Sequence, residues 1–234
     1  MDKEQMKKGF RDAIPIVVGY VPVAMAYGLM AKNAGLSIYD TALMSLMVFA
    51  GASQFMAVGL IASFVGFGEI IISTFLVNFR HFLMSASLSS RLKNTDKRWR
   101  LIMAFGVTDE VFSVASFYKG DIGPSYLVPL EVASYGSWVL GGILGHFMGQ
   151  ALPEAVGSSM GVALYAMFMA LLIPEVRENW AIAVLAIISA TINTILYSFV
   201  GISKGWSIVI AIIVASAFGA TVFKNYKGGE EDEG

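Results

Sequence analysis

Long apolar stretches dominate the chain, and short polar connections separate them. A helix that crosses a bilayer needs about 20 mostly apolar residues, and eight segments meet or approach that length. They cover residues 13–31, 41–66, 69–90, 100–118, 124–149, 157–173, 179–201 and 206–223. This pattern predicts an all-α, polytopic transmembrane helix bundle of about six to eight apolar segments, of which one or two are discontinuous or re-entrant. We expect residues 1–223 to form a single membrane domain and residues 224–234 to be an acidic, disordered tail.

The composition supports a membrane protein and argues against several kinds of functional site. Hydrophobic residues make up 56% of the chain and charged residues only 14%, whereas about a quarter of the residues in soluble domains are charged. A formal net charge of -1 gives no reason to expect a nucleic-acid partner. The chain has two histidines, no cysteine, no phosphate-binding loop and no zinc-protease motif. We therefore expect no metal, no cofactor and no enzymatic activity, and any transport must use a gradient or substrate exchange.

Two groups of basic residues predict which helix ends face the cytoplasm, because positive charge concentrates in cytoplasmic loops. They are Lys3, Lys7, Lys8 and Arg11 at the start, and Arg91, Lys93, Lys97, Arg98 and Arg100 after the third segment. Three simple crossings cannot connect two cytoplasmic ends, so either one of the first three segments is broken or re-entrant or the charge rule fails at this loop, and we favour a broken segment. We expect the break in 41–66, where Gly51 lies among small polar residues, and 69–90 is the alternative. Freed backbone at membrane depth must be buried in protein or line a wet cavity, so a break predicts an internal site.

A weak internal repeat relates residues 13–90 to residues 124–201. An ungapped offset of 114 aligns identical residues such as Pro15 with Pro129 and Gly28 with Gly142. If 100–118 is a simple crossing, the second half enters the membrane upside down. The sequence then favours an inverted repeat, a design common in secondary transporters.

Ionisable residues near the middle of two segments are the main candidates for chemistry. Asn78, Arg80 and His81 lie in 69–90, and Asp109 and Glu110 lie in 100–118. A charge at this depth costs about 3 kcal/mol on insertion scales, so it needs a partner or a function. One interpretation is a structural ion pair, and the other is that Arg80 receives a substrate carboxylate while Asp109 or Glu110 receives its ammonium group. For His81 a packing role is favoured over a proton relay, although imidazole titrates near neutral pH.

Four strings in the first half of the chain resemble the AzlC family of branched-chain amino acid permeases. They are Gly9-Phe10-Arg11 before Ile14-Pro15, Phe49-Ala50-Gly51-Ala52-Ser53-Gln54-Phe55, Asn78-Phe79-Arg80-His81-Phe82-Leu83 followed by Ser87-Leu88, and Thr108-Asp109-Glu110. The resemblance runs over nearly the whole chain. It departs from the family where Val23-Ala24-Met25 follows Pro22 in place of Pro-Phe-Gly, which leaves the substrate range open.

The resemblance implies export of branched-chain amino acids such as valine, leucine or isoleucine across the cytoplasmic membrane of a prokaryote, together with a small AzlD-type membrane subunit. We place the substrate site at Gly51, Ala52, Ser53, Gln54, Asn78 and Arg80. The candidate coupling or ion-pair residues are His81, Asp109 and Glu110, with a proton as the candidate coupling ion. Glu131, close to Pro129, is a weaker functional candidate. The competing interpretations are a non-transporting membrane subunit that stabilises or regulates a partner, and a channel.

Overall fold

The computed structural model describes residues 2–92, 95–120, 122–148, 169, 172–173, 176–177 and 179–223. Its helices are α1 (Lys3–Asn33), α2 (Ile38–Met47), α3 (Gly51–Ala62), α4 (Phe67–Arg91), α5 (Lys97–Gly106), α6 (Asp109–Phe117), α7 (Pro124–Met148), α9 (Trp180–Ser198) and α10 (Lys204–Val222). Within these described residues all regular structure is helical, which confirms the all-α class. The segment expected at 157–173 lies outside the described residues except for Met169, Leu172 and Ile173, and the acidic tail lies outside them entirely.

Five of the described helices are long and apolar enough to cross a membrane. They are α1, α4, α7, α9 and α10, and they match the expected segments 13–31, 69–90, 124–149, 179–201 and 206–223. Large apolar side chains such as Phe75, Phe82 and Leu140 are more than half exposed on these helices, as expected for surfaces that face lipid. The chain is therefore a multi-pass membrane protein built as a helical bundle.

The described chain forms two compact units, and the functional candidates all belong to the first. Unit 1 comprises Met1–Gly59 and Val77–Ala163, and unit 2 comprises Leu60–Leu76 and Leu164–Gly234. In unit 2, α9 and α10 pack against each other, and Ser207 Oγ donates a hydrogen bond to Asn193 Oδ1 at 2.9 Å. Ser203 Oγ donates to Glu69 Oε2 at 2.5 Å and joins the start of α10 to the start of α4.

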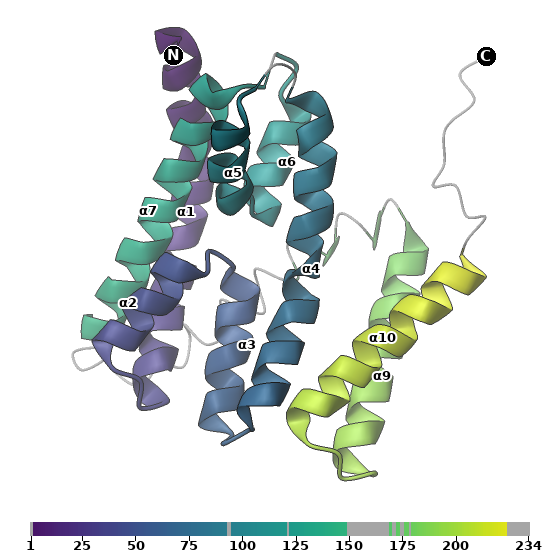
Figure 1. Cartoon of the computed structure of the whole chain (residues 1–234). Helices are drawn as coiled ribbons and strands as arrows, with labels where there is room; N and C mark the ends of the chain where they lie inside the picture. The colour runs from purple at the N-terminus through teal and green to yellow at the C-terminus, as the bar shows by residue number, and fades with distance from the viewer. Residues whose placement is uncertain are drawn as a thin grey trace. The chain divides into compact units, whose positions relative to one another are not determined.

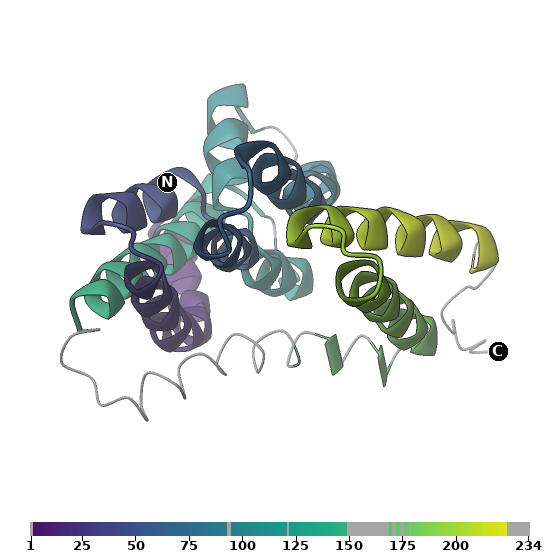
Figure 2. The same ribbon diagram turned by 90° about the horizontal axis from the view of Figure 1, so that it is seen from below.

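The centre of unit 1 is a parallel pair of helices, α1 and α7 (Figures 1 and 2). At one end the Asp2 amide donates to Ser125 Oγ at 2.9 Å, and near the other end Gly28 lies against the backbone of Gly142. Residue numbers thus rise in the same direction along both helices. The absence of a side chain at Gly28 permits this close approach. The expectation of an inverted repeat is not supported, because α7 runs parallel to α1.

Helices α2 and α3 form a re-entrant hairpin, which confirms the expected break in 41–66. The helix stops after Met47 and resumes at Gly51, with Val48 in an extended conformation. Thr41, near the start of α2, is hydrogen-bonded to His146 near the end of α7 at 3.0 Å. Gly59, on the returning arm, lies beside Met30 near the end of α1. Both arms therefore reach the same end of unit 1, and the alternative break in 69–90 is wrong because α4 is continuous.

Helices α5 and α6 form a second re-entrant hairpin that enters from the opposite end, the end that carries the N-terminus (Figure 1). Arg100 Nη2, on the first turn of α5, donates to the carbonyl of Leu92 beyond α4 at 2.9 Å. Arg91, the last residue of α4, donates to the carbonyl of Ala115 at 2.9 Å and to that of Tyr118, at the end of α6, at 2.5 Å.

The expectation that 100–118 crosses the membrane is therefore wrong. The physical reason is that Thr108 caps a new helix: its Oγ1 accepts a hydrogen bond from the Val111 amide at 3.3 Å, and acidic residues occupy the first turn. Each arm has ten or nine residues, which at 1.5 Å per residue is about half the hydrocarbon thickness.

The two basic groups meet at this end of unit 1, as the charge pattern predicts. Lys8 Nζ lies 5.3 Å from the centre of the Tyr118 ring, and Arg91 binds the carbonyl of Tyr118. We call this the basic end, defined by Lys8, Arg91 and Arg100. The first hairpin enters unit 1 from the other end.

The close approach of α1 and α7 predicts that Gly28→Ala destabilises the protein. A Cβ at position 28 would lie 2.7 Å from the His146 backbone nitrogen and closer still to the Gly142 carbonyl oxygen. We expect the free energy of unfolding, measured by SDS titration in detergent micelles, to fall by about 1 to 3 kcal/mol. Gly19→Ala on the same helix is the control, because no packed neighbour among the described residues lies within 4 Å of its added Cβ. Equal stability of the two variants would contradict the parallel packing.

Candidate functional site

Tyr20 of α1 joins the two helix breaks. Its ring packs edge-on against Phe49, in the break between α2 and α3, with centroids 6.1 Å apart. Its hydroxyl lies 2.7 Å from Thr108 Oγ1, in the break between α5 and α6, and donates to Glu110 Oε2 at 2.5 Å. The side chain is only 5% exposed. Sequence reasoning missed Tyr20, because one polar ring in an apolar segment carries no signal that separates it from an interfacial tyrosine.

The first break is held by a buried polar chain that starts at Trp138 of α7. Trp138 Nε1 donates to Gln54 Oε1 at 2.8 Å, and Gln54 Nε2 donates to Ser45 Oγ at 3.1 Å. The indole also lies directly over Gly51, where a Cβ would come within 2.6 Å of Cη2. A larger residue than glycine at position 51 would therefore collide with Trp138, which sequence reasoning also missed.

The remaining residues expected at this break are buried in the first turn of α3. Ala52 and Ser53 are 9% and 2% exposed, and Ser53 Oγ donates to the carbonyl of Ala50 at 2.9 Å. The first amides of an α-helix have no partner within the helix, and its N-terminus favours negative charge. The start of α3 is therefore suited to bind an anionic group at mid-depth.

The second break carries an ion pair between α4 and α6. Arg80 Nη2 lies 2.9 Å from Asp109 Oδ2, with 35% and 26% of the two side chains exposed. Asp109 and Glu110 occupy the first turn of α6, where the helix dipole stabilises their negative charge. The ion pair that the sequence made possible is thus formed, and Glu110 has a separate partner in Tyr20.

His81 is tied to the backbone of the second break. Its Nδ1–H donates to the carbonyl of Val107 at 2.8 Å, a group that no helix satisfies. Arg80 and His81 thus reach the same break from adjacent positions of α4, one binding a carboxylate and the other a carbonyl.

Four buried polar atoms near these residues have no hydrogen-bond partner among the described residues. They are Asn78 Oδ1, Arg80 Nε, His81 Nε2 and Glu131 Oε1. Buried polar atoms are nearly always hydrogen-bonded in proteins, so each exception needs an explanation such as a ligand, water or proton. Three of the four belong to the string Asn78–His81, which holds candidate site residues predicted from the sequence.

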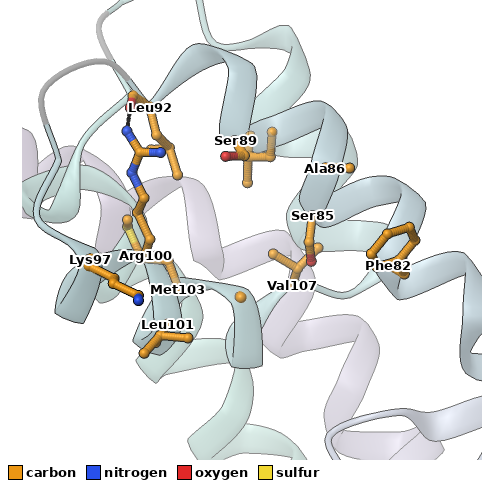
Figure 3. A pocket seen from close by; sticks show the side chains of 12 residues that line it. Phe82, Ser85, Ala86, Ser89, Leu92, Lys97, Arg100, Leu101, Met103 and Val107 are labelled. Carbon is orange, nitrogen blue, oxygen red and sulfur yellow. Dashed lines mark hydrogen bonds between the residues drawn. The ribbon is translucent and has the colours of Figure 1, made fainter.

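A cavity of about 280 Å³ lies between α4 and α5. It extends from Lys97 and Arg100, near the basic end, to Val107 at the break, and its other walls include Phe82, Leu101 and Met103 (Figure 3). Arg100 points toward the carbonyl of Leu92, to which it donates a hydrogen bond (Figure 3). Apolar walls with basic groups at one end suit a small molecule that has an apolar part and a negative charge.

Comparisons with known proteins find relatives that are described as membrane proteins. Residues 15–152 match the family model described as AzlC protein. The chain is similar to the inner membrane protein YgaZ of Escherichia coli, with 31% identity over 82% of each chain. It is 37% identical to an uncharacterized membrane protein of Archaeoglobus fulgidus, over 73% of this chain and 76% of that one.

A third relative has a name that states a role. The branched-chain amino acid transport protein AzlC of Bacillus subtilis is 27% identical over 63% of this chain and 60% of its own. No solved structure matches.

The contact between Gly51 and Trp138 predicts a coupled pair of mutations. Gly51→Ala forces the indole to move and should lower the free energy of unfolding by about 1 to 3 kcal/mol. Trp138→Phe should cost a similar amount, because it leaves Gln54 Oε1 without its donor. The double variant should cost less than the sum, because the smaller ring leaves room for the methyl group.

SDS titration in micelles measures all three variants. Gly136→Ala on α7 is the control, since within the described ranges no packed neighbour lies within 4 Å of its added Cβ. Strict additivity of the two changes would show that the indole does not constrain position 51.

Proposed function

The chain belongs to the AzlC family of membrane proteins, and from that premise we propose that it is a secondary transporter that exports branched-chain amino acids. It would work in the cytoplasmic membrane of a prokaryote, with a small AzlD-type membrane subunit as its partner. The name of the Bacillus subtilis relative supports the substrate class. The basic end of unit 1 then faces the cytoplasm.

The observation that carries the proposal is the ion pair between Arg80 and Asp109 at a helix break. A zwitterionic amino acid carries the same two charges as this pair. Its carboxylate can replace Asp109 at the Arg80 guanidinium, and its ammonium group can replace Arg80 at Asp109. The exchange conserves charge at membrane depth, so the site contains balanced charges both with and without substrate.

Apolar and aromatic surface beside the ion pair fits a branched side chain. Tyr20 links the second break to Phe49 and Trp138, whose rings pack edge-on against it with centroids 6.1 and 5.3 Å away. Gln54 and Ser53 place polar groups among these rings. A small number of polar groups within an apolar lining is the usual composition of a site for a small ligand.

Two re-entrant hairpins that enter unit 1 from opposite ends support alternating access. Discontinuous helices at the bilayer midplane characterise the sites of many secondary transporters. Tyr20 binds both breaks at once, so opening either side requires movement at its contacts. The cavity between α4 and α5 offers an approach to the second break from the basic end.

The substrate role of the ion pair predicts a specific pattern of valine efflux. Cells without their own exporters express the chain with an AzlD-type partner and are loaded with radiolabelled valine. Arg80→Ala and Asp109→Asn should each reduce efflux roughly 10- to 100-fold, because each removes a charged hydrogen bond of about 1.5 to 3 kcal/mol. Arg80→Lys should retain little activity, since a lysine cannot bind a carboxylate in the bidentate manner.

A charge swap separates an ion pair that binds the substrate from one that is only structural. Arg80→Asp combined with Asp109→Arg restores the pair but reverses the substrate's charge partners, so efflux should stay low. Full efflux in the swapped protein would show that the pair serves packing alone. Arg98→Ala, at an exposed residue of α5, is the control, and absence of efflux in every arm despite verified insertion would reject the proposed transport.

A further inference from the structure

The buried carboxyl group of Glu131 has no role in the site described above. Glu131 lies in α7 and is 4% exposed. Its Oε1 has no hydrogen-bond partner and its side chain no ion pair among the described residues. The carboxyl group packs against Gly106, the last residue of α5, where an added Cβ would lie 2.6 Å from Oε2. Position 106 must therefore be glycine for the carboxyl group to fit.

The other titratable groups around the second break already have partners. Tyr20 of α1 donates to Glu110 of α6, Arg80 of α4 pairs with Asp109 of α6, and His81 of α4 donates to the Val107 carbonyl.

Several further titratable groups on the packed elements bind other residues or lie farther along their helices. On α7, Tyr135 lies one turn from Glu131 and donates to the carbonyl of Leu46. Tyr126, at the start of α7, donates to Asp12 of α1. On α2, Asp40 accepts hydrogen bonds from Ser37 in the cap at the far end of the helix. Lys97, Arg98 and Arg100 of α5 belong to its first turn at the basic end, more than one helical turn from Gly106. None of these groups is bonded to Glu131, so within the part of the chain that the structure describes the carboxyl group lacks a cation that would stabilise its negative form.

An ionised carboxylate without a partner costs several kcal/mol in a membrane interior, and a protonated carboxyl group avoids that cost. We propose that Glu131 is the proton-binding residue that couples export to a proton gradient, with its carboxyl group protonated while α5 covers it. The inference rests on the proposed transport function. Movement of the α5–α6 hairpin would uncover the carboxyl group, and water would then stabilise the carboxylate and accept the proton. In each transport cycle the carboxylate takes one proton from water on one side of the membrane and releases it to water on the other, with no further change in bonding.

This assignment differs from the sequence-based choice of His81, Asp109 and Glu110 as coupling residues. Asp109 is already paired with Arg80, and His81 donates its Nδ1–H to a carbonyl oxygen. A proton carrier must exchange its proton with water in one state and be shielded in the other. In this structure Glu131 is shielded from water. Because its carboxyl group packs against the end of α5, a half-length helix, movement of α5 would expose it to water.

The test uses the full chain purified with its small partner and reconstituted into proteoliposomes. Two activities are measured for each variant: exchange of labelled valine for unlabelled valine at equal pH on both sides, and accumulation of valine driven by a pH gradient. A pH-sensitive dye inside the vesicles reports proton movement on addition of valine. Glu131→Gln has the shape and neutrality of the protonated group, so it should fold.

The expected result is that Glu131→Gln keeps exchange within about twofold of the unmodified chain and loses both gradient-driven accumulation and valine-dependent proton movement. Glu131→Asp should retain coupling with a changed pH profile, and Gly106→Ala should weaken coupling by displacing the carboxyl group. Glu4→Gln, an exposed carboxyl change, is the control and should alter neither activity.

Four results would overturn the inference. Gradient-driven accumulation by Glu131→Gln would show that another group carries the proton. Loss of exchange as well, in folded protein, would make Glu131 part of the substrate site or the fold. An unmodified chain that exchanges valine but ignores the pH gradient would reject proton coupling and leave the transport function standing, whereas a chain that does not exchange valine would reject the function itself.

Discussion

Backbone groups freed at helix breaks inside a bilayer must find partners within the protein, and much of unit 1 is arranged around this constraint. The carbonyl of Leu46, in the last turn of α2, accepts a hydrogen bond from Tyr135. The Val107 carbonyl accepts one from His81. Each donor is a polar side chain within an apolar helix, so the residues that make two half-length helices possible also bring polar groups to mid-depth.

The first break could be predicted from sequence and the second could not. Positive charge before and after the first three segments indicated that one of these helices is interrupted, and Gly51 among small residues indicated where. The interruption at Val107 was hidden, because 100–118 has the length of a full crossing. Thr108 followed by Asp109 and Glu110 has the composition of a helix start, but the same charges also suggest a buried ion pair. Both interpretations, a helix start and an ion pair, are correct, because Asp109 is the first residue of α6 and also the partner of Arg80.

Contacts between residues far apart in the chain could not be predicted from the sequence. Tyr20 and Trp138 belong to long apolar segments, and nothing local separates a ring that donates to Glu110 or Gln54 from one that faces lipid. The parallel direction of α1 and α7 was missed for a related reason. The direction of α7 depends on whether the preceding hairpin crosses the membrane, so one unrecognised break reversed the expected direction. The alignment of Gly28 with Gly142 survives this correction, and the two glycines pack against each other.

Residues 106–110 bring the two proposed events, substrate binding and proton binding, within one short segment. Gly106 contacts the Glu131 carboxyl group, and Asp109, three residues further on, pairs with Arg80. A movement of the α5–α6 hairpin would change the hydration of Glu131 and the geometry of the ion pair together. Coupling between the two sites then needs no long pathway through the protein. It needs only that the α5–α6 hairpin has two positions and that substrate and proton each bind one position better than the other. A half-length helix is suited to this, because its buried end is anchored by a few side-chain hydrogen bonds in place of a continuous backbone ladder.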